Sequence, residues 1–348
     1  GGLGGAAGEG ILRSLDSGKN WENAAVSEEK RISFPSAILD MAFHPKNSDT
    51  IFVGAKSSGL WRSDNGGKSW HKILDKAHVL DPRADVYKIG LSPANLKVMY
   101  LAVFQNGRGR VLKSEDGGET FREIYFVTAN RFGVFDLFVS KSDTDYVTII
   151  TGQGGVLNSQ NGGRTWRVKK WFSEALIKFL VNPNFAGELF VLTSSGNLFK
   201  SFDGGGNWAD LNEGLRGRAA GLQYPPPGAI NPFGGLSTIN TIQSLVADPN
   251  NFSTLYMGSL QGILRSADGG FSWERLNVLI PPEALPVNSV AIDPRNSNII
   301  FAAASNQFHR SDDGGKNWSI QTLPVKSRVK ELLIHPLKPE IMFALLGK

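Results

Sequence analysis

The chain has 348 residues, a formal net charge of +5 and no cysteine. The lack of cysteine excludes disulfides, thiolate metal sites and cysteine nucleophiles, and no apolar run reaches the ~18 residues that a membrane-spanning helix needs. Although the chain is mildly basic, it has no long Lys/Arg run. We therefore expect no nucleic-acid partner.

The first ten residues contain six Gly and show no periodicity. Such a segment predicts a flexible tether over residues 1–10. Gly-rich starts of this kind are similar to the tether that follows the lipidated cysteine of bacterial lipoproteins. A lipid-anchored tether and an extracytoplasmic location (secreted, periplasmic or cell-surface) are therefore expected.

From residue 11 onward, one short pattern recurs seven times: Ser-x-Asp/Asn-x-Gly-x-(Ser/Thr/Asn)-aromatic. The copies span 14–21, 63–70, 114–121, 159–166, 201–208, 266–273 and 311–318. Each follows a short apolar strand pattern. The Asp or Asn oxygen can accept nearby backbone N–H groups, Gly at the fifth position permits a positive φ, and the final aromatic begins another strand. The pattern therefore predicts a tight turn between two strands.

A second repeat precedes each of these strands. It consists of two apolar strand patterns around a turn that usually contains Pro. The copies span 41–54, 89–102, 137–151, 179–193, 245–258, 290–302 and 332–344. Together the two repeats predict a unit of four antiparallel strands.

The two ends of the propeller region each supply half a unit. Residues 11–23 carry the third and fourth strands of a unit, and residues 327–347 carry the first and second. If the halves pair, they form a seventh blade and leave no open sheet edge between them. The sequence therefore predicts an all-β fold over 11–348: a single seven-bladed β-propeller with four antiparallel strands per blade.

The repeated turn resembles the Asp-box, or BNR repeat, of four propeller groups. These are the sialidases, the sortilin-type Vps10 propellers, the family 74 xyloglucan hydrolases and the photosystem II assembly factors of the Ycf48/HCF136 type. In those families the Asp-box faces away from the ligand. The resemblance therefore implies a structural, turn-forming role for Asp16, Asn65, Asp116, Asn161, Asp203, Asp268 and Asp313.

The enzymatic members of these families carry motifs that this chain lacks. Sialidases have a Phe/Tyr-Arg-Ile-Pro motif, and the nearest string here, Arg-Ile-Ser-Phe-Pro at 31–35, departs from it. Family 74 hydrolases carry an acid in the hairpin between the second and third strands, and the hairpins that we identify here contain none. The resemblance therefore favours a binding propeller over an enzyme.

One connection between units is unusually long. Residues 212–241 widen the spacing of the turns to 65 residues and contain Arg216, Arg218 and Tyr224. Long insertions on rigid scaffolds are often binding loops, and a tolerated surface loop is the alternative. The Pro-rich loop at 280–286 is expected to neighbour this insertion.

A column of polar residues occupies one position of every first strand. In chain order its members are Asp40, Lys88, Asp136, Lys178, Ser244, Ser289 and Glu331. If the first strands are innermost, the column rings a central channel. One interpretation is a belt of ion pairs between blades. The other is the floor of a ligand site, in which Asp40 beside Glu331 could act as an acid/base pair.

Further candidates are weaker, and no metal or cofactor is expected. Lys326, Arg328 and Lys330 alternate just before the first strand of the final unit. One interpretation is a basic stripe on the same rim, and a solvated edge is the favoured alternative. His44 and His335 lack partners at metal-ligand spacing. The sequence thus predicts a monomeric, non-enzymatic propeller that binds a protein segment or a polysaccharide. A glycoside hydrolase and an assembly factor for a membrane complex are the alternatives.

Overall fold

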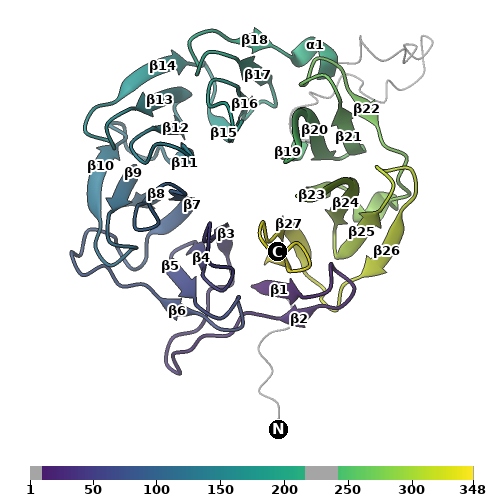
Figure 1. Cartoon of the computed structure of the whole chain (residues 1–348), viewed down its shortest axis with the longest axis horizontal. Helices are drawn as coiled ribbons and strands as arrows, with labels where there is room; N and C mark the ends of the chain where they lie inside the picture. Colours follow the sequence, from purple (N-terminus) through teal and green to yellow (C-terminus); the bar gives the residue numbers. More distant parts are fainter. Residues whose placement is uncertain (1–9, 216–241, 348) are drawn as a thin grey trace. The chain divides into compact units, whose positions relative to one another are not determined.

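The computed structural model describes residues 10–215 and 242–347. These residues form seven four-stranded antiparallel sheets (Figure 1), together with the single-turn helix α1 (Asn212–Leu215) and a 3-10 turn at Pro282–Ala284. The fold is an all-β, seven-bladed propeller, as the sequence predicts. Contacts divide the described residues into unit 1 (residues 10–23, 194–199, 209–215 and 242–347) and unit 2 (residues 24–193 and 200–208).

Unit 2 contains three whole sheets, each built from consecutive strands. They are β3 (Ile38–Phe43), β4 (Ile51–Ala55), β5 (Gly59–Ser63) and β6 (His71–Lys72); β7 (Asp85–Leu91), β8 (Met99–Gln105), β9 (Arg108–Ser114) and β10 (Arg122–Phe126); and β11 (Val134–Val139), β12 (Val147–Thr151), β13 (Gly155–Ser159) and β14 (Arg167–Trp171). A fourth sheet is divided between the units: β15 (Leu176–Val181), β16 (Leu189–Thr193), β17 (Leu198–Ser201) and β18 (Ala209–Asp210).

Unit 1 contains the other three sheets. Two are again consecutive: β19 (Ile242–Asp248), β20 (Asn251–Ser259), β21 (Gly262–Ser266) and β22 (Glu274–Arg275); and β23 (Val287–Asp293), β24 (Asn296–Ala304), β25 (Gln307–Ser311) and β26 (Ser319–Thr322). The third joins β1 (Ile11–Ser14) and β2 (Glu22–Asn23) to β27 (Arg328–Ile334) and β28 (Met342–Gly347).

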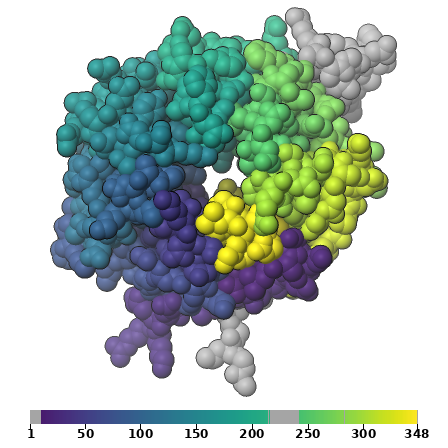
Figure 2. Space-filling model, viewed as in Figure 1, coloured from purple at the N-terminus to yellow at the C-terminus, as the bar shows by residue number. Residues whose placement is uncertain are grey.

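The sheet made from both ends of the chain has the order β2-β1-β28-β27. Ile11 pairs with Leu345 and Ser14 with Met342 in an antiparallel register. In Figure 2 the purple N-terminal strands lie against the yellow C-terminal strands. The predicted seventh blade is therefore formed, with its first strand starting at Arg328 rather than at residue 327.

Every repeated turn is held by the same three hydrogen bonds. In the turn after β5, Ser63 Oγ donates to Asn65 Oδ1 at 2.9 Å and accepts the N–H of Gly67 at 2.9 Å, while Asn65 Oδ1 accepts the N–H of Ser69. The same bonds recur in the other six turns. Gly67 has a φ of 80°, which a side chain would disfavour. The turn is thus a polar clamp between two strands.

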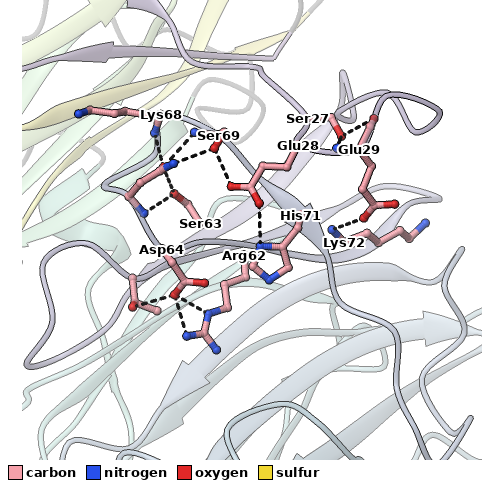
Figure 3. A network of polar contacts seen from close by, with 12 residues as sticks. Ser27, Glu28, Glu29, Arg62, Ser63, Asp64, Lys68, Ser69, His71 and Lys72 are labelled. Atoms are coloured by element: carbon pink, nitrogen blue, oxygen red, sulfur yellow. Dashed lines mark hydrogen bonds and ion pairs between the residues drawn. The ribbon is translucent and has the colours of Figure 1, made fainter.

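One of these turns also anchors the segment that leads into β3 (Figure 3). Ser69 Oγ donates to Glu28 Oε1 at 2.6 Å, and the N–H of Glu28 donates to the carbonyl of Trp70 at 2.8 Å. Ser27 forms a parallel bridge with Trp70. This segment therefore covers part of the outer edge of its sheet.

Cations and aromatic rings face each other across the second and third strands. Arg62 lies 5.6 Å from the ring of Phe52, and the two residues are direct cross-strand partners. Equivalent cation–ring contacts join Lys113 to Tyr100, Lys200 to Phe190, and Arg310 to Phe301. In one blade both the cation and the ring are replaced. There Asn158 faces Thr148 and donates to its Oγ1 at 3.1 Å. Five of the seven blades thus show a matched contact at this position.

His309 is a polar residue at a buried position of β25. It is fully buried, and neither ring nitrogen has a hydrogen-bond partner among the described residues. The same repeat position is apolar in the other six blades: Leu12, Trp61, Leu112, Leu157, Phe199 and Leu264. A neutral imidazole is therefore held where the repeat otherwise places an apolar side chain.

Acid should destabilise the protein through His309. Burial lowers the pKa of its ring from 6.5 to about 4. Because only the unfolded chain binds the proton in this window, the free energy of unfolding falls as the pH drops from 6.5 towards 4, by about 3 kcal/mol in total. We expect urea titrations at pH 7 and pH 4.5 to show a loss of roughly 2–3 kcal/mol that His309→Leu escapes. Parallel pH profiles for the two proteins would refute this.

Candidate functional site

A β-bulge interrupts the first strand of every sheet, close to the end that carries the hairpin between the second and third strands. The residues in the bulges are Leu39, Tyr87, Phe135, Ile177, Gln243, Asn288 and Lys330. The next residue in each strand is the member of the predicted polar column. Bulges redirect side chains and are common beside functional sites, so this end of the first strands is the candidate site.

Within unit 2, Lys88 lies between two carboxylates of the column. Its Nζ is 3.1 Å from Asp40 Oδ1 and 3.8 Å from Asp136 Oδ1. Both carboxylates are nearly buried, whereas Lys88 is 31% exposed. The three residues come from β3, β7 and β11. They thus form a chain of alternating charge across three sheets, which is the arrangement of an ion-pair belt.

The column also fastens one sheet to the next through the backbone. Asp40 Oδ2 accepts the N–H of Ile89 at 2.8 Å in unit 2. In unit 1, Ser289 Oγ accepts the N–H of Leu332 at 3.0 Å. Ile89 and Leu332 each lie two residues after the bulge, where the local ladder is disrupted. An acceptor at this position therefore has a structural role whether or not it is charged.

Aromatic and cationic groups accompany the column in unit 2. The rings of Tyr87 and Phe135, both from bulges, meet edge-to-face with centroids 5.3 Å apart. Burial raises the pKa of Tyr87, with a further contribution from Asp85, so its hydroxyl stays protonated at neutral pH. Lys178 forms no ion pair with any residue that the structure describes. Its charge is available to a ligand.

A second group of exposed residues, which we call the hairpin patch, surrounds the hairpin between β8 and β9. It consists of Arg108, Phe126, Asn130 and Phe132. The Arg108 guanidinium lies 5.6 Å from the Phe126 ring and donates to Asn130 Oδ1 at 2.8 Å. The carbonyl of Phe132 accepts the N–H of Gly109, and both phenyl rings are substantially exposed. Exposed rings beside a cation suit recognition of a ligand.

Sequence reasoning did not find the hairpin patch. The available signals were the Asn-Gly turn at 106–107, Phe126 at the end of β10, and Phe132 in the segment after it. The prediction instead favoured the long insertion, whose candidates Arg216, Arg218 and Tyr224 lie outside the described residues.

The remaining predicted residues lie in unit 1. Glu331 follows the bulge in β27, and its pairing with Asp40 of unit 2 stays a prediction. Lys326, Arg328 and Lys330 are all exposed, and the residues between them are more buried. None of these three cations forms an ion pair with a described residue. Exposure thus alternates along residues 326–330, and the basic stripe stays a prediction.

The aspartates of the repeated turns accept hydrogen bonds and have a low proton affinity. The backbone N–H of Asn207 holds the pKa of Asp203 at about 2, and the N–H of Asn317 does the same for Asp313. Both groups stay ionised at neutral pH, where a general acid must carry a proton. No group of three or more His, Asp or Glu among the described residues could hold a metal ion. Within the same residues, no helix is long and apolar enough to cross a membrane.

Comparison with known proteins gives a partial sequence match and a full match of the fold. No protein-family model matches the chain. The xyloglucanase Xgh74A of Acetivibrio thermocellus is 27% identical over 134 residues, which cover 33% of this chain and 16% of that protein. The matched part is thus a small share of the enzyme.

Solved structures cover nearly all of the chain. The GH74 xyloglucanase of Xanthomonas campestris (TM-score 0.68, 15% identity) covers 94% of this chain, which in turn covers 52% of it. The GH74 enzyme of Niastella koreensis (TM-score 0.65, 19% identity) covers 89% of this chain, which covers 51% of that enzyme. The structure of YCF48 bound to D1 peptide (TM-score 0.65, 14% identity) covers 90% of this chain, which covers 94% of YCF48. These likenesses show the fold. The chain spans about half the length of the two GH74 enzymes and nearly all of the length of YCF48.

Proposed function

We propose that this chain is a non-enzymatic Asp-box propeller that binds a protein segment at the hairpin ends of its sheets. The hairpin patch carries the proposal, because it presents two exposed phenyl rings and a guanidinium around the hairpin between β8 and β9. Little reorganisation is then needed on binding. A bound D1 peptide on a propeller of similar size and fold, YCF48, supports a peptide ligand.

The polar column supports binding over catalysis. A glycoside hydrolase needs two carboxyl groups with separate roles at the reaction centre. Here Asp40 and Asp136 are nearly buried and share Lys88, and Asp40 also accepts a backbone N–H. Both carboxylates therefore have a structural role, in ion pairs and in a backbone hydrogen bond. An exported or cell-surface propeller that works as a monomer is the setting that we propose.

Binding can be tested with peptides selected from a random displayed library on the full chain. We expect Phe126→Ala and Arg108→Ala to weaken the selected peptides about tenfold or more, as loss of a hot-spot contact does. Phe202→Ala is the matched control, because Phe202 is an exposed ring with a cation, Lys200, 4.4 Å away, but lies in a repeated turn. Equal losses in all three variants, or none, would contradict the proposal.

A xyloglucan hydrolase is the second candidate, favoured by the partial match to Xgh74A. Turnover of xyloglucan by the full chain, lost in Asp40→Asn or Glu331→Gln, would replace the binding proposal with this one. Binding of xyloglucan oligosaccharides without turnover would instead identify the ligand as a glycan. An assembly role would appear as co-purification with a membrane protein complex that Phe126→Ala abolishes.

A further inference from the structure

A pocket of about 740 Å³ opens in unit 1, and no member of the polar column is among its lining residues. Its walls are residues 275–281, which run from the end of β22 towards the next sheet, together with Gln307 of β25 and Ile320 of β26. Leu279 is 81% exposed and Ile320 is 50% exposed. Two large aliphatic side chains therefore stand in solvent at one opening.

The pocket lies where this blade departs from the repeat. The position of Ile320 is polar in five of the other six blades: Asn23, Lys72, Glu123, Asp210 and Arg275. The position of Gln307 is Gly in four of the seven blades. The pocket therefore combines an apolar side chain where most blades are polar with a polar side chain where most blades have Gly. Gln307 Oε1 is buried and has no hydrogen-bond partner among the described residues, so it can accept an N–H from a ligand.

Positive charge borders the pocket on two sides. Arg275 lies in its wall and forms no ion pair with a described residue. On the other side, the hairpin that precedes Gln307 holds the segment of the basic stripe: Asn306 Nδ2 donates to the carbonyl of Val325 at 2.8 Å, and the N–H of Val329 donates to the carbonyl of Ser305 at 2.8 Å. Lys326, Arg328 and Lys330 thus begin one hairpin away from the pocket. Glu331 is the one acidic residue of β27.

We infer that the pocket and the stripe form a docking site for an extended acidic peptide with an aliphatic anchor. The anchor fills the pocket against Leu279 and Ile320, a backbone N–H of the peptide pairs with Gln307, and carboxylates along the peptide face the stripe. The lining has aliphatic side chains and no aromatic ring, so it offers no stacking platform for a sugar. The site belongs to unit 1, and it does not depend on the function proposed for the hairpin patch.

The probe is a fluorescein-labelled synthetic peptide that has one Leu followed by three Glu at alternating positions. Two companions replace the Leu with Ser or the three Glu with Lys. Fluorescence anisotropy with the full chain should show saturable binding of the first peptide, about tenfold weaker binding of the Ser companion, and none of the Lys companion. Added salt should weaken the binding.

Variants of the protein locate the site. Leu279→Ser and Arg328→Ser should each weaken the probe about tenfold. The matched controls are Phe271→Ser and Lys316→Ser, because both residues are exposed in unit 1 and lie in repeated turns. All four changes are at exposed side chains, and circular dichroism melting checks the fold.

Three results would overturn the inference: absence of saturable binding, equal binding of the Ser companion, or equal loss in the controls. Concentration-dependent self-association that Leu279→Ser abolishes, without probe binding, would assign the pocket to a second copy of the chain instead.

Discussion

Leu12→Asp should prevent the protein from folding. Leu12 is 4% exposed in β1 and packs among Phe308, Leu332 and Met342. Loss of a buried leucine costs about 2–5 kcal/mol, and an unpaired carboxylate in the same place adds its desolvation. The sum approaches the ~5–15 kcal/mol by which a domain is stable. The variant should be insoluble or lack a cooperative urea transition.

Leu15→Asp is the matched control for this prediction. Leu15 is only three residues away and is 51% exposed, so its replacement should leave the urea midpoint close to that of the wild type. If Leu12→Asp unfolds with the same midpoint as the control, the sheet formed by the two ends of the chain does not hold the fold together.

Lys88→Met should be the most destabilising change in the polar column. It leaves Asp40 and Asp136 nearly buried without their shared cation. Breaking a buried ion pair from one side costs about 3–5 kcal/mol. Because Lys88 is 31% exposed, solvent screens part of the charge, and we expect the lower end, about 3 kcal/mol, in urea unfolding.

Neutralising the acids should rescue this variant. Asp136→Asn in the Lys88→Met background should recover part of the loss, whereas Lys170→Met, at an exposed lysine of the same unit, should be neutral. A Lys88→Met variant as stable as the wild type, with altered ligand binding, would move the column from a structural to a ligand-binding role.

The repeats made most of the fold predictable. Because the Ser, the Asp or Asn and the Gly of each turn all contact one another locally, as Ser63, Asn65 and Gly67 do, a pattern of eight residues carries the whole geometry. The half units at the two ends implied their own pairing, and Ile11 beside Leu345 is the result. Local hydrogen bonds and a constant period are properties that one sequence displays.

The bulges and the surface sites were not predictable in the same way. Bulged residues range from Leu39 to Lys330, since the backbone requires an extra residue there and not a particular side chain. A belt of alternating charge was one of the two interpretations of the column, and the Lys88 contacts have that arrangement. The backbone bond from Ile89 to Asp40 was not predicted, because it depends on the bulge. The pocket needs three segments, from β22, β25 and β26, to meet in space. Only departures from the repeat, at Gln307 and Ile320, hinted at it.

The sheet that joins the two ends of the chain has a mechanical consequence. β1 and β28 are antiparallel, and Ile11, at the start of β1, pairs with Leu345 near the end of β28. A force that pulls the flanking segments apart therefore acts at one end of this strand pair. It opens the hydrogen bonds one after another, rather than loading them together. Tension along the chain should thus unzip β1 from β28 at low force, before any other sheet yields.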